Sequence, residues 1–166
     1  WHWLNALGLL VLLVTGFQIR FVDLLDLMSF ETAVKLHNWV GLVVIANWFL
    51  WFIYYLFSER ATNYHPDLNP KSFFQRYFLQ AAYYGWGYFH GAERPHEVQP
   101  GDKFHPLQKL TYQFIMFISA PLTFLTGLMM WDVQRFQSLI DLAGGLRVVN
   151  TVHVVMFILF VMFVLV

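Results

Sequence analysis

Four long stretches of the chain contain no Asp, Glu, Lys or Arg, and this feature constrains the fold more than any other. The stretches are residues 1–19, 36–58, 110–131 and 148–166. A hydrocarbon core about 30 Å thick is crossed by roughly 20 residues of helix. Each stretch is close to that length, so the sequence predicts four transmembrane helices. Their expected bounds are about 1–21, 33–58, 105–131 and 147–166.

The composition agrees with a membrane protein and excludes several kinds of partner and site. Hydrophobic residues make up 58% of the 166 residues and charged ones only 12%, against about 25% charged in an ordinary globular domain. We therefore expect an all-α membrane protein with one domain over 1–166. The formal net charge is zero and the Lys and Arg residues are scattered, which argues against a nucleic-acid partner. Without cysteine the chain has no iron–sulfur or thiolate site, so any redox centre needs histidine or methionine.

The segments between the predicted helices differ in character. Residues 20–35 form a short connector in which Ser29 is a candidate N-cap. The loop over 59–104 is long, polar and interrupted by prolines, and within it residues 73–89 hold nine aromatic residues and one charge. That density predicts an interfacial segment at about 73–90, lying in the headgroup layer; a loop folded over the end of the bundle is the alternative. Residues 132–147 make the last connector.

Lys and Arg counts give an expected orientation. Six lie on the side of the long loop: Arg60, Lys71, Arg76, Arg94, Lys103 and Lys109. Four lie on the other side: Arg20, Lys35, Arg135 and Arg147. The positive-inside rule then places the long loop and both chain ends in the cytoplasm. The chain starts on Trp1 rather than Met and stops inside an apolar run, so we expect a fragment at both ends.

Three of the seven histidines fall within the four uncharged stretches. His37 and His153 each open a helix at the outer side, whereas His2 opens a helix at the inner side. Unpaired ring nitrogens are costly in hydrocarbon, although each histidine taken singly is equally well explained by contact with the interface or a backbone carbonyl. Two at equal depth, with Gly41 one turn from His37 to admit a flat ring, indicate a haem iron bound from both faces. Two imidazoles alone make a poor zinc or copper site. A residue of the last helix at the same membrane depth as His2 would fall at or just beyond the end of the sequence.

Four stretches together resemble a known family. They are HWLNALGLLVLLVTGF (2–17), KLHNWVGL (35–42), KFHPLQKLTYQFIMFISAPLTFLTGLMM (103–130) and RVVNTVHVVMFILFVMFVLV (147–166). In this order they resemble the di-haem cytochrome b membrane subunits of respiratory formate dehydrogenases, nickel–iron hydrogenases and thiosulfate reductases, most closely the thiosulfate reductase type. The resemblance covers all four helices but not residues 59–102.

The resemblance implies a four-helix bundle that binds two b-type haems. It implies His37 and His153 on the outer haem and His2 on the inner haem. In the family the last helix supplies one ligand to each haem, fourteen residues apart. The second inner ligand is therefore expected at position 167, just after Val166.

The resemblance also implies a quinone site beside the inner haem, where the third helix begins. The matching segment is FHPLQK (104–109), which suggests His105, Gln108 and Lys109 as polar lining for menaquinone or ubiquinone. A histidine has its pKa near the working pH and is suited to accept a quinol proton. The alternative is that Gln108 and Lys109 only anchor the helix at the interface. The family has Asn where this chain has His105.

These features together predict quinone-linked transmembrane electron transfer in the bacterial or archaeal cytoplasmic membrane. The chain would be the membrane subunit of a respiratory oxidoreductase, with quinol oxidation or quinone reduction as its own chemistry. The expected partner is a larger iron–sulfur, multihaem, molybdenum or nickel–iron protein at the outer face. The alternative function is a haem-free membrane anchor or a small transporter, which predicts polar residues at mid-membrane. The mid-helix positions are almost wholly apolar, and Pro121 is the one clear interruption.

Overall fold

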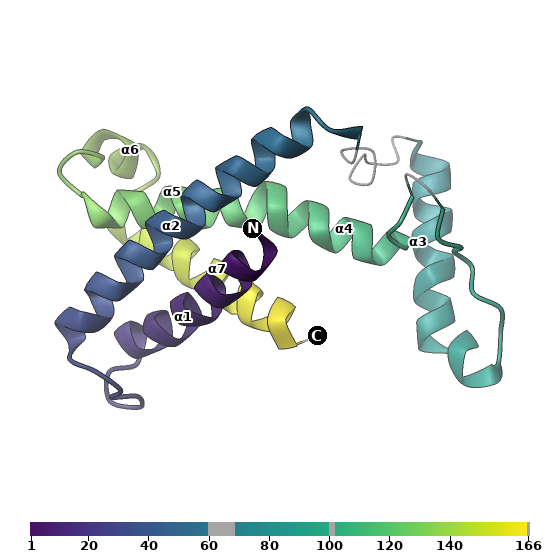
Figure 1. The fold of residues 1–166 in the computed structure, drawn as a ribbon, viewed down its shortest axis with the longest axis horizontal. Helices are drawn as coiled ribbons and strands as arrows, with labels where there is room; N and C mark the ends of the chain where they lie inside the picture. Colours follow the sequence, from purple (N-terminus) through teal and green to yellow (C-terminus); the bar gives the residue numbers. More distant parts are fainter. Residues whose placement is uncertain (60–68, 100–101, 166) are drawn as a thin grey trace. The chain divides into compact units, whose positions relative to one another are not determined.

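The computed structural model describes residues 1–59, 69–99 and 102–165 (Figure 1). Arg60 and Val166, named above, lie outside these ranges. The elements in chain order are α1 (His2–Arg20), α2 (Phe30–Leu56), α3 (Pro70–Gly85), η2 (Gly87–His90), α4 (Pro106–Phe114), η3 (Ile115–Ser119), α5 (Ala120–Trp131), α6 (Gln137–Leu142) and α7 (Leu146–Leu165).

Within the described ranges, four helices are long and apolar enough to cross a membrane, which confirms the all-α membrane fold. The spans are His2–Arg20, Phe30–Leu56, Pro106–Trp131 and Leu146–Leu165. Their ends lie within about three residues of those expected from the sequence, which is the usual scatter of helix boundaries. The third span contains α4, the π turn η3 and α5. Pro121 follows that π turn, and its ring and missing N–H disfavour a regular α-helical turn at this point.

The chain divides into two compact units. The first contains Trp1–Ile53 and Ile118–Val166, and the second contains Tyr54–Phe117.

In the first unit, α1 and α2 form a hairpin with contacts along its length. Near the connector, buried Gln18 donates a hydrogen bond to the Met28 carbonyl. Ser29 caps α2 as expected, because its Oγ accepts from the Thr32 N–H at 3.2 Å. At the other end of the hairpin, Asn47 donates to the Trp1 carbonyl at 3.0 Å. These contacts join both ends of two antiparallel helices.

A second hairpin in the same unit joins α5 to α7 through the short helix α6 (Figure 1). Met129, Ile140 and Val149, one from each of these helices, form a buried apolar cluster. After α6, Gly144 and Gly145 adopt φ of 95° and 97°, which a side chain would disfavour. The Gly145 N–H bonds back to the Ile140 carbonyl at 2.8 Å, so the turn closes the end of α6.

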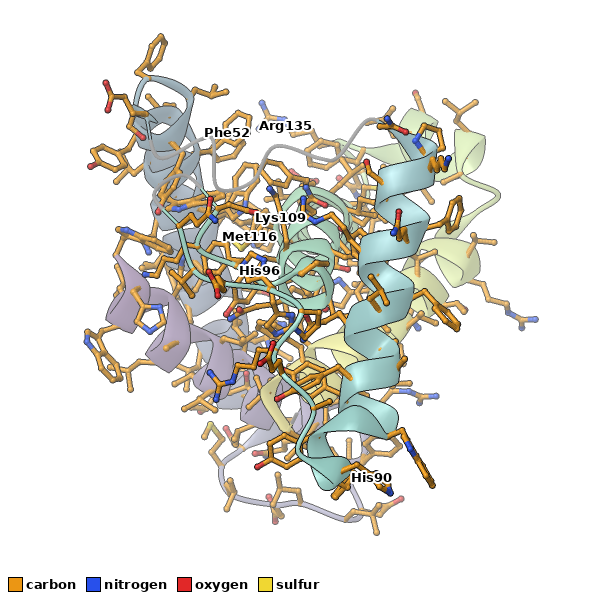
Figure 2. All side chains as sticks on the ribbon, turned by 90° about the vertical axis from the view of Figure 1, so that its right-hand side faces the viewer. Phe52, His90, His96, Lys109, Met116 and Arg135 are labelled. Carbon is orange, nitrogen blue, oxygen red and sulfur yellow. The ribbon has the colours of Figure 1, made fainter. Side chains whose placement is uncertain are left out.

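The second unit joins α3 and η2 to the start of α4. Asn69 caps α3 by accepting from the Lys71 N–H at 3.1 Å. Asp102 pairs with Arg76 at 2.8 Å and with Lys109 at 3.5 Å, which holds the loop before α4 against α3. His90 stacks on Trp86, with ring centroids 4.1 Å apart. In Figure 2, His90 lies at the lower end of this segment, away from His96 and Lys109.

Candidate functional site

The rings of His37 and His153 face each other inside the first unit. His37 lies on α2 and His153 on α7, and their ring centroids are 6.4 Å apart with an interplanar angle of 68°. The two residues are 116 positions apart in the sequence, so only the packing of the two hairpins brings them together.

The separation of the rings suits a shared metal ion. Metal–imidazole bonds are about 2 Å long and a ring nitrogen lies about 1 Å from its centroid, so two rings on opposite sides of one ion have centroids roughly 6 Å apart. Among the described residues, no three His, Cys, Asp or Glu side chains gather to hold a metal. Two opposed imidazoles without further protein ligands fit an ion whose other four ligands come from a macrocycle, as in haem.

Each ring is held by the neighbouring helix of its own hairpin. Thr15 Oγ1 on α1 lies 2.9 Å from His37 Nδ1, and Thr126 Oγ1 on α5 lies 2.9 Å from His153 Nδ1. The hydroxyl contact of each ring is thus made at Nδ1, and the backbone of Thr123 is a further hydrogen-bond partner of the His153 ring. Because the threonine hydroxyls hold each ring at Nδ1, Nε2 is the nitrogen suited to bind a metal ion.

Glycines next to these threonines leave room for the rings. A Cβ added at Gly16 would lie 3.3 Å from His37 Cε1, and one added at Gly127 would lie 3.3 Å from His153 Cε1. Gly41, named from the sequence, instead faces Leu12 of α1, with its virtual Cβ 3.9 Å from Leu12 Cδ2. Its contact with a haem stays a prediction.

His2 lies at the start of α1 and is exposed, with its ring against Trp1 and Trp3. The helix that would supply its partner, α7, remains helical to Leu165. Its ligand role stays a prediction.

In the second unit, the residues named for a quinone site lie at the start of α4. His105 is the N-cap of this helix, because its Nδ1 accepts from the Gln108 N–H at 3.2 Å. Gln108 Nε2 donates to Tyr112 Oη at 3.0 Å. The ring of Tyr84 on α3 lies 5.6 Å from the His105 ring, between centroids.

The cap decides what His105 can do chemically. With Nδ1 accepting a backbone hydrogen bond, the neutral ring carries its proton on Nε2 and can donate from there. Burial, and secondarily the nearby His96, lowers the pKa of His105 from its ordinary value, which also favours the neutral ring. The role of proton acceptor expected from the sequence would require breaking the cap, at a cost of about 1 kcal/mol.

The third residue named for the quinone site, Lys109, forms an ion pair. Burial alone would raise the pKa of its partner Asp102, but Arg76 and Lys109 outweigh that effect and the pKa lies below its ordinary value. Asp102 is thus a carboxylate at neutral pH, and Lys109 is engaged with it.

Comparison with known proteins identifies the family of the chain. Residues 1–166 match the family described as prokaryotic cytochrome b561. The chain belongs to that family. It is 31% identical over 130 residues to the Escherichia coli (strain K12) protein named "Putative cytochrome YdhU", an alignment that covers 78% of this chain and 48% of the relative. The chain thus spans about half the length of the curated relative it matches. No solved structure matches it.

Family membership identifies the chain as a membrane electron-transfer protein of the cytochrome b type, with haem b as its implied cofactor. It thereby confirms the cytochrome b resemblance drawn from the sequence, and it favours electron transfer over a haem-free anchor or transporter. Thr15, Thr126, Gly16 and Gly127 were not recognised from the sequence as site residues. The one available signal was the Thr-Gly pair that ends both LLVLLVTGF (9–17) and APLTFLTGL (120–128).

Proposed function

We propose that this chain is the membrane subunit of a respiratory oxidoreductase and carries electrons across the membrane between quinone and a larger redox partner. The observation that carries the proposal is the opposed pair His37 and His153. Their spacing and the threonine contacts at their Nδ1 atoms support ligation of haem b by both rings. When bound, haem supplies reversible one-electron exchange at its iron.

The proposal includes two haems, an outer one held by His37 and His153 and an inner one held by His2. The second ligand of the inner haem is expected just after Val166. A residue fourteen positions beyond His153 is displaced by about 21 Å along a helix and rotated by about 40° around it. The helical course of α7 to Leu165 supports this spacing.

Quinone is proposed to bind at the start of α4, near His105, Gln108 and Lys109. The Nε2–H of neutral His105 suits a quinone carbonyl oxygen. The side-chain amide of Gln108 donates to Tyr112, so its Oε1 is suited to accept a quinol hydroxyl. A donor and an acceptor one helical turn apart are the polar groups that the two redox states of a quinone require.

The remaining parts of the proposal concern the membrane and the partner. The Lys and Arg distribution supports a cytoplasmic location for the long loop and both ends, in the inner membrane. The segment at about 73–90 exposes large aromatic side chains, among them Phe74, Phe78, Trp86 and Phe89, which supports its placement in the headgroup layer. A partner with iron–sulfur, multihaem, molybdenum or nickel–iron centres would exchange electrons with the outer haem.

A haem count tests the proposal directly. The purified full-length protein should show a b-type α-band in its dithionite-reduced minus oxidised spectrum and two haems per chain in a pyridine haemochrome assay. Absence of the band would rule out the electron-transfer proposal. A count of one would rule out the two-haem arrangement.

Replacing Gln108 with alanine should slow haem reduction by a menaquinol analogue about 3- to 10-fold, since one hydrogen bond contributes roughly 0.5–1.5 kcal/mol. Stopped-flow absorbance at the α-band measures this rate. Thr111→Val is the matched control, because Thr111 is exposed on the same helix and bonds only back to the Leu107 carbonyl. If the haem of both Gln108→Ala and Thr111→Val is reduced at the wild-type rate, quinone binds elsewhere.

A further inference from the structure

Two Thr-Gly pairs occupy equivalent places beside the two facing histidines. Thr15-Gly16 lies on α1 against His37, and Thr126-Gly127 lies on α5 against His153. The same two distances are found at His37 and at His153. The threonine hydroxyl lies 2.9 Å from Nδ1, and a Cβ added at the glycine would lie 3.3 Å from Cε1. A contact that recurs with the same geometry on two hairpins is a built feature of the site.

The direction of each hydrogen bond follows from the other contact of the threonine. Thr15 Oγ1 lies 2.7 Å from the Val11 carbonyl oxygen, and Thr126 Oγ1 lies 2.7 Å from the Leu122 carbonyl oxygen. A carbonyl only accepts and a hydroxyl has a single proton, so that proton is committed to the backbone. The hydroxyl oxygen must then accept from the histidine, which puts the ring proton on Nδ1 and the lone pair on Nε2.

Burial makes these bonds hard to replace. Thr15 is 1% exposed and Thr126 is 6% exposed, so solvent does not reach these sites to accept a hydrogen bond from Nδ1. The adjacent glycines set the second constraint, because a methyl group at 3.3 Å from Cε1 would push each ring by a few tenths of an ångström. Hydroxyl and glycine together fix both the tautomer and the plane of each ring.

We propose that Thr15 and Thr126 are positioning residues that set the electronic state and the crossed orientation of the two axial imidazoles. This rests on the proposed function, in which His37 and His153 bind the outer haem. A ligand histidine that donates its second N–H is a more basic ligand and stabilises the ferric state. The 68° angle between the rings further predicts a ferric low-spin EPR signal with the large maximum g value of crossed imidazole planes.

The test compares Thr15→Val and Thr126→Val with the wild type in the full haem-loaded protein. Valine keeps the shape but removes the acceptor, so each variant should raise the midpoint potential of one haem and shift its maximum g value. Thr15→Ser, which restores a hydroxyl, should return both readouts toward the wild type. The matched control is Thr123→Val, because the Thr123 hydroxyl bonds back to the Ser119 carbonyl on the same helix as Thr126, and the substitution keeps the Thr123 backbone that contacts Thr126 Oγ1 and His153.

Each outcome of this comparison either supports or contradicts the positioning role of Thr15 and Thr126. A raised potential and shifted g value in both valine variants, with neither change in Thr123→Val, would support the proposal. Unchanged values in both would overturn it. If Thr15→Val loses haem altogether, retention of haem by Thr15→Ser supports the role of the hydroxyl and equal loss by both contradicts it. Failure of the proposed ligation would look different, because His37→Ala would then keep its full haem content.

Discussion

Replacing His153 with alanine should remove the outer haem completely and leave the inner one in place. The ring of His153 supplies one of only two protein ligands proposed for that iron, and no other histidine ring contact to His37 is found among the described residues. The haemochrome count should fall from two per chain to one, and one component of the redox titration should disappear. His37→Ala should give the same result.

Three companion variants sharpen this prediction. The double variant His37→Ala/His153→Ala should lose no more haem than either single one, because the two residues act on one site. His153→Met should keep some haem at a higher potential, since a thioether is an accepted axial ligand that favours the ferrous state. His90→Ala is the control, because His90 is exposed and stacked on Trp86. Two haems in His153→Ala would show that the pairing is wrong.

Replacing Ile140 with alanine should destabilise the α5–α7 hairpin by about 2–5 kcal/mol. Ile140 is 1% exposed and packs with Met129 of α5 and Val149 of α7. The lost side chain would leave a cavity that three connected helices cannot easily close. Equilibrium unfolding in mixed detergent micelles, followed by tryptophan fluorescence, measures the change.

Leu142 provides the control for Ile140. It lies two residues further along α6 but is 83% exposed, so Leu142→Ala should change the free energy of unfolding by no more than about 0.5 kcal/mol. Ile140→Val removes one methylene and should cost about 0.5–1.5 kcal/mol. Equal losses for Ile140→Ala and Leu142→Ala would contradict the buried position of Ile140.

Much of the fold was predictable from the sequence because the bilayer imposes its thickness on apolar stretches. The absence of charge located four spans, and Ser29 marked the start of one of them. The pairing of His37 with His153 was predictable from depth alone, since residues that open helices on the same side of a membrane lie at the same level. The helix α6 was not foreseen within the connector 132–147, because six residues carry too little periodicity to show a helix.

The contacts around the candidate sites were less predictable, for a different reason. Depth fixes where a residue lies along the membrane normal but not which way its helix is rotated. Gly41 lies near Leu12 of α1 and Gly16 lies against the His37 ring, and neither neighbour could be identified from depth; the contact of Gly41 with a haem stays a prediction. Likewise His105 is a helix cap, a role that depends on the backbone angles at one residue.

The two Thr–His bonds also bear on how the molecule assembles. Each bond joins neighbouring helices of a single hairpin, with partners 22 residues apart in one case and 27 in the other. Each hairpin can therefore orient its own histidine while it is still separate from the other. Haem would then join two half-sites that are already formed and act as a cross-link between the two hairpins of the chain. A ligand that binds only the assembled state adds its binding free energy to the stability of that state, so cofactor supply would set how much of the protein is correctly assembled.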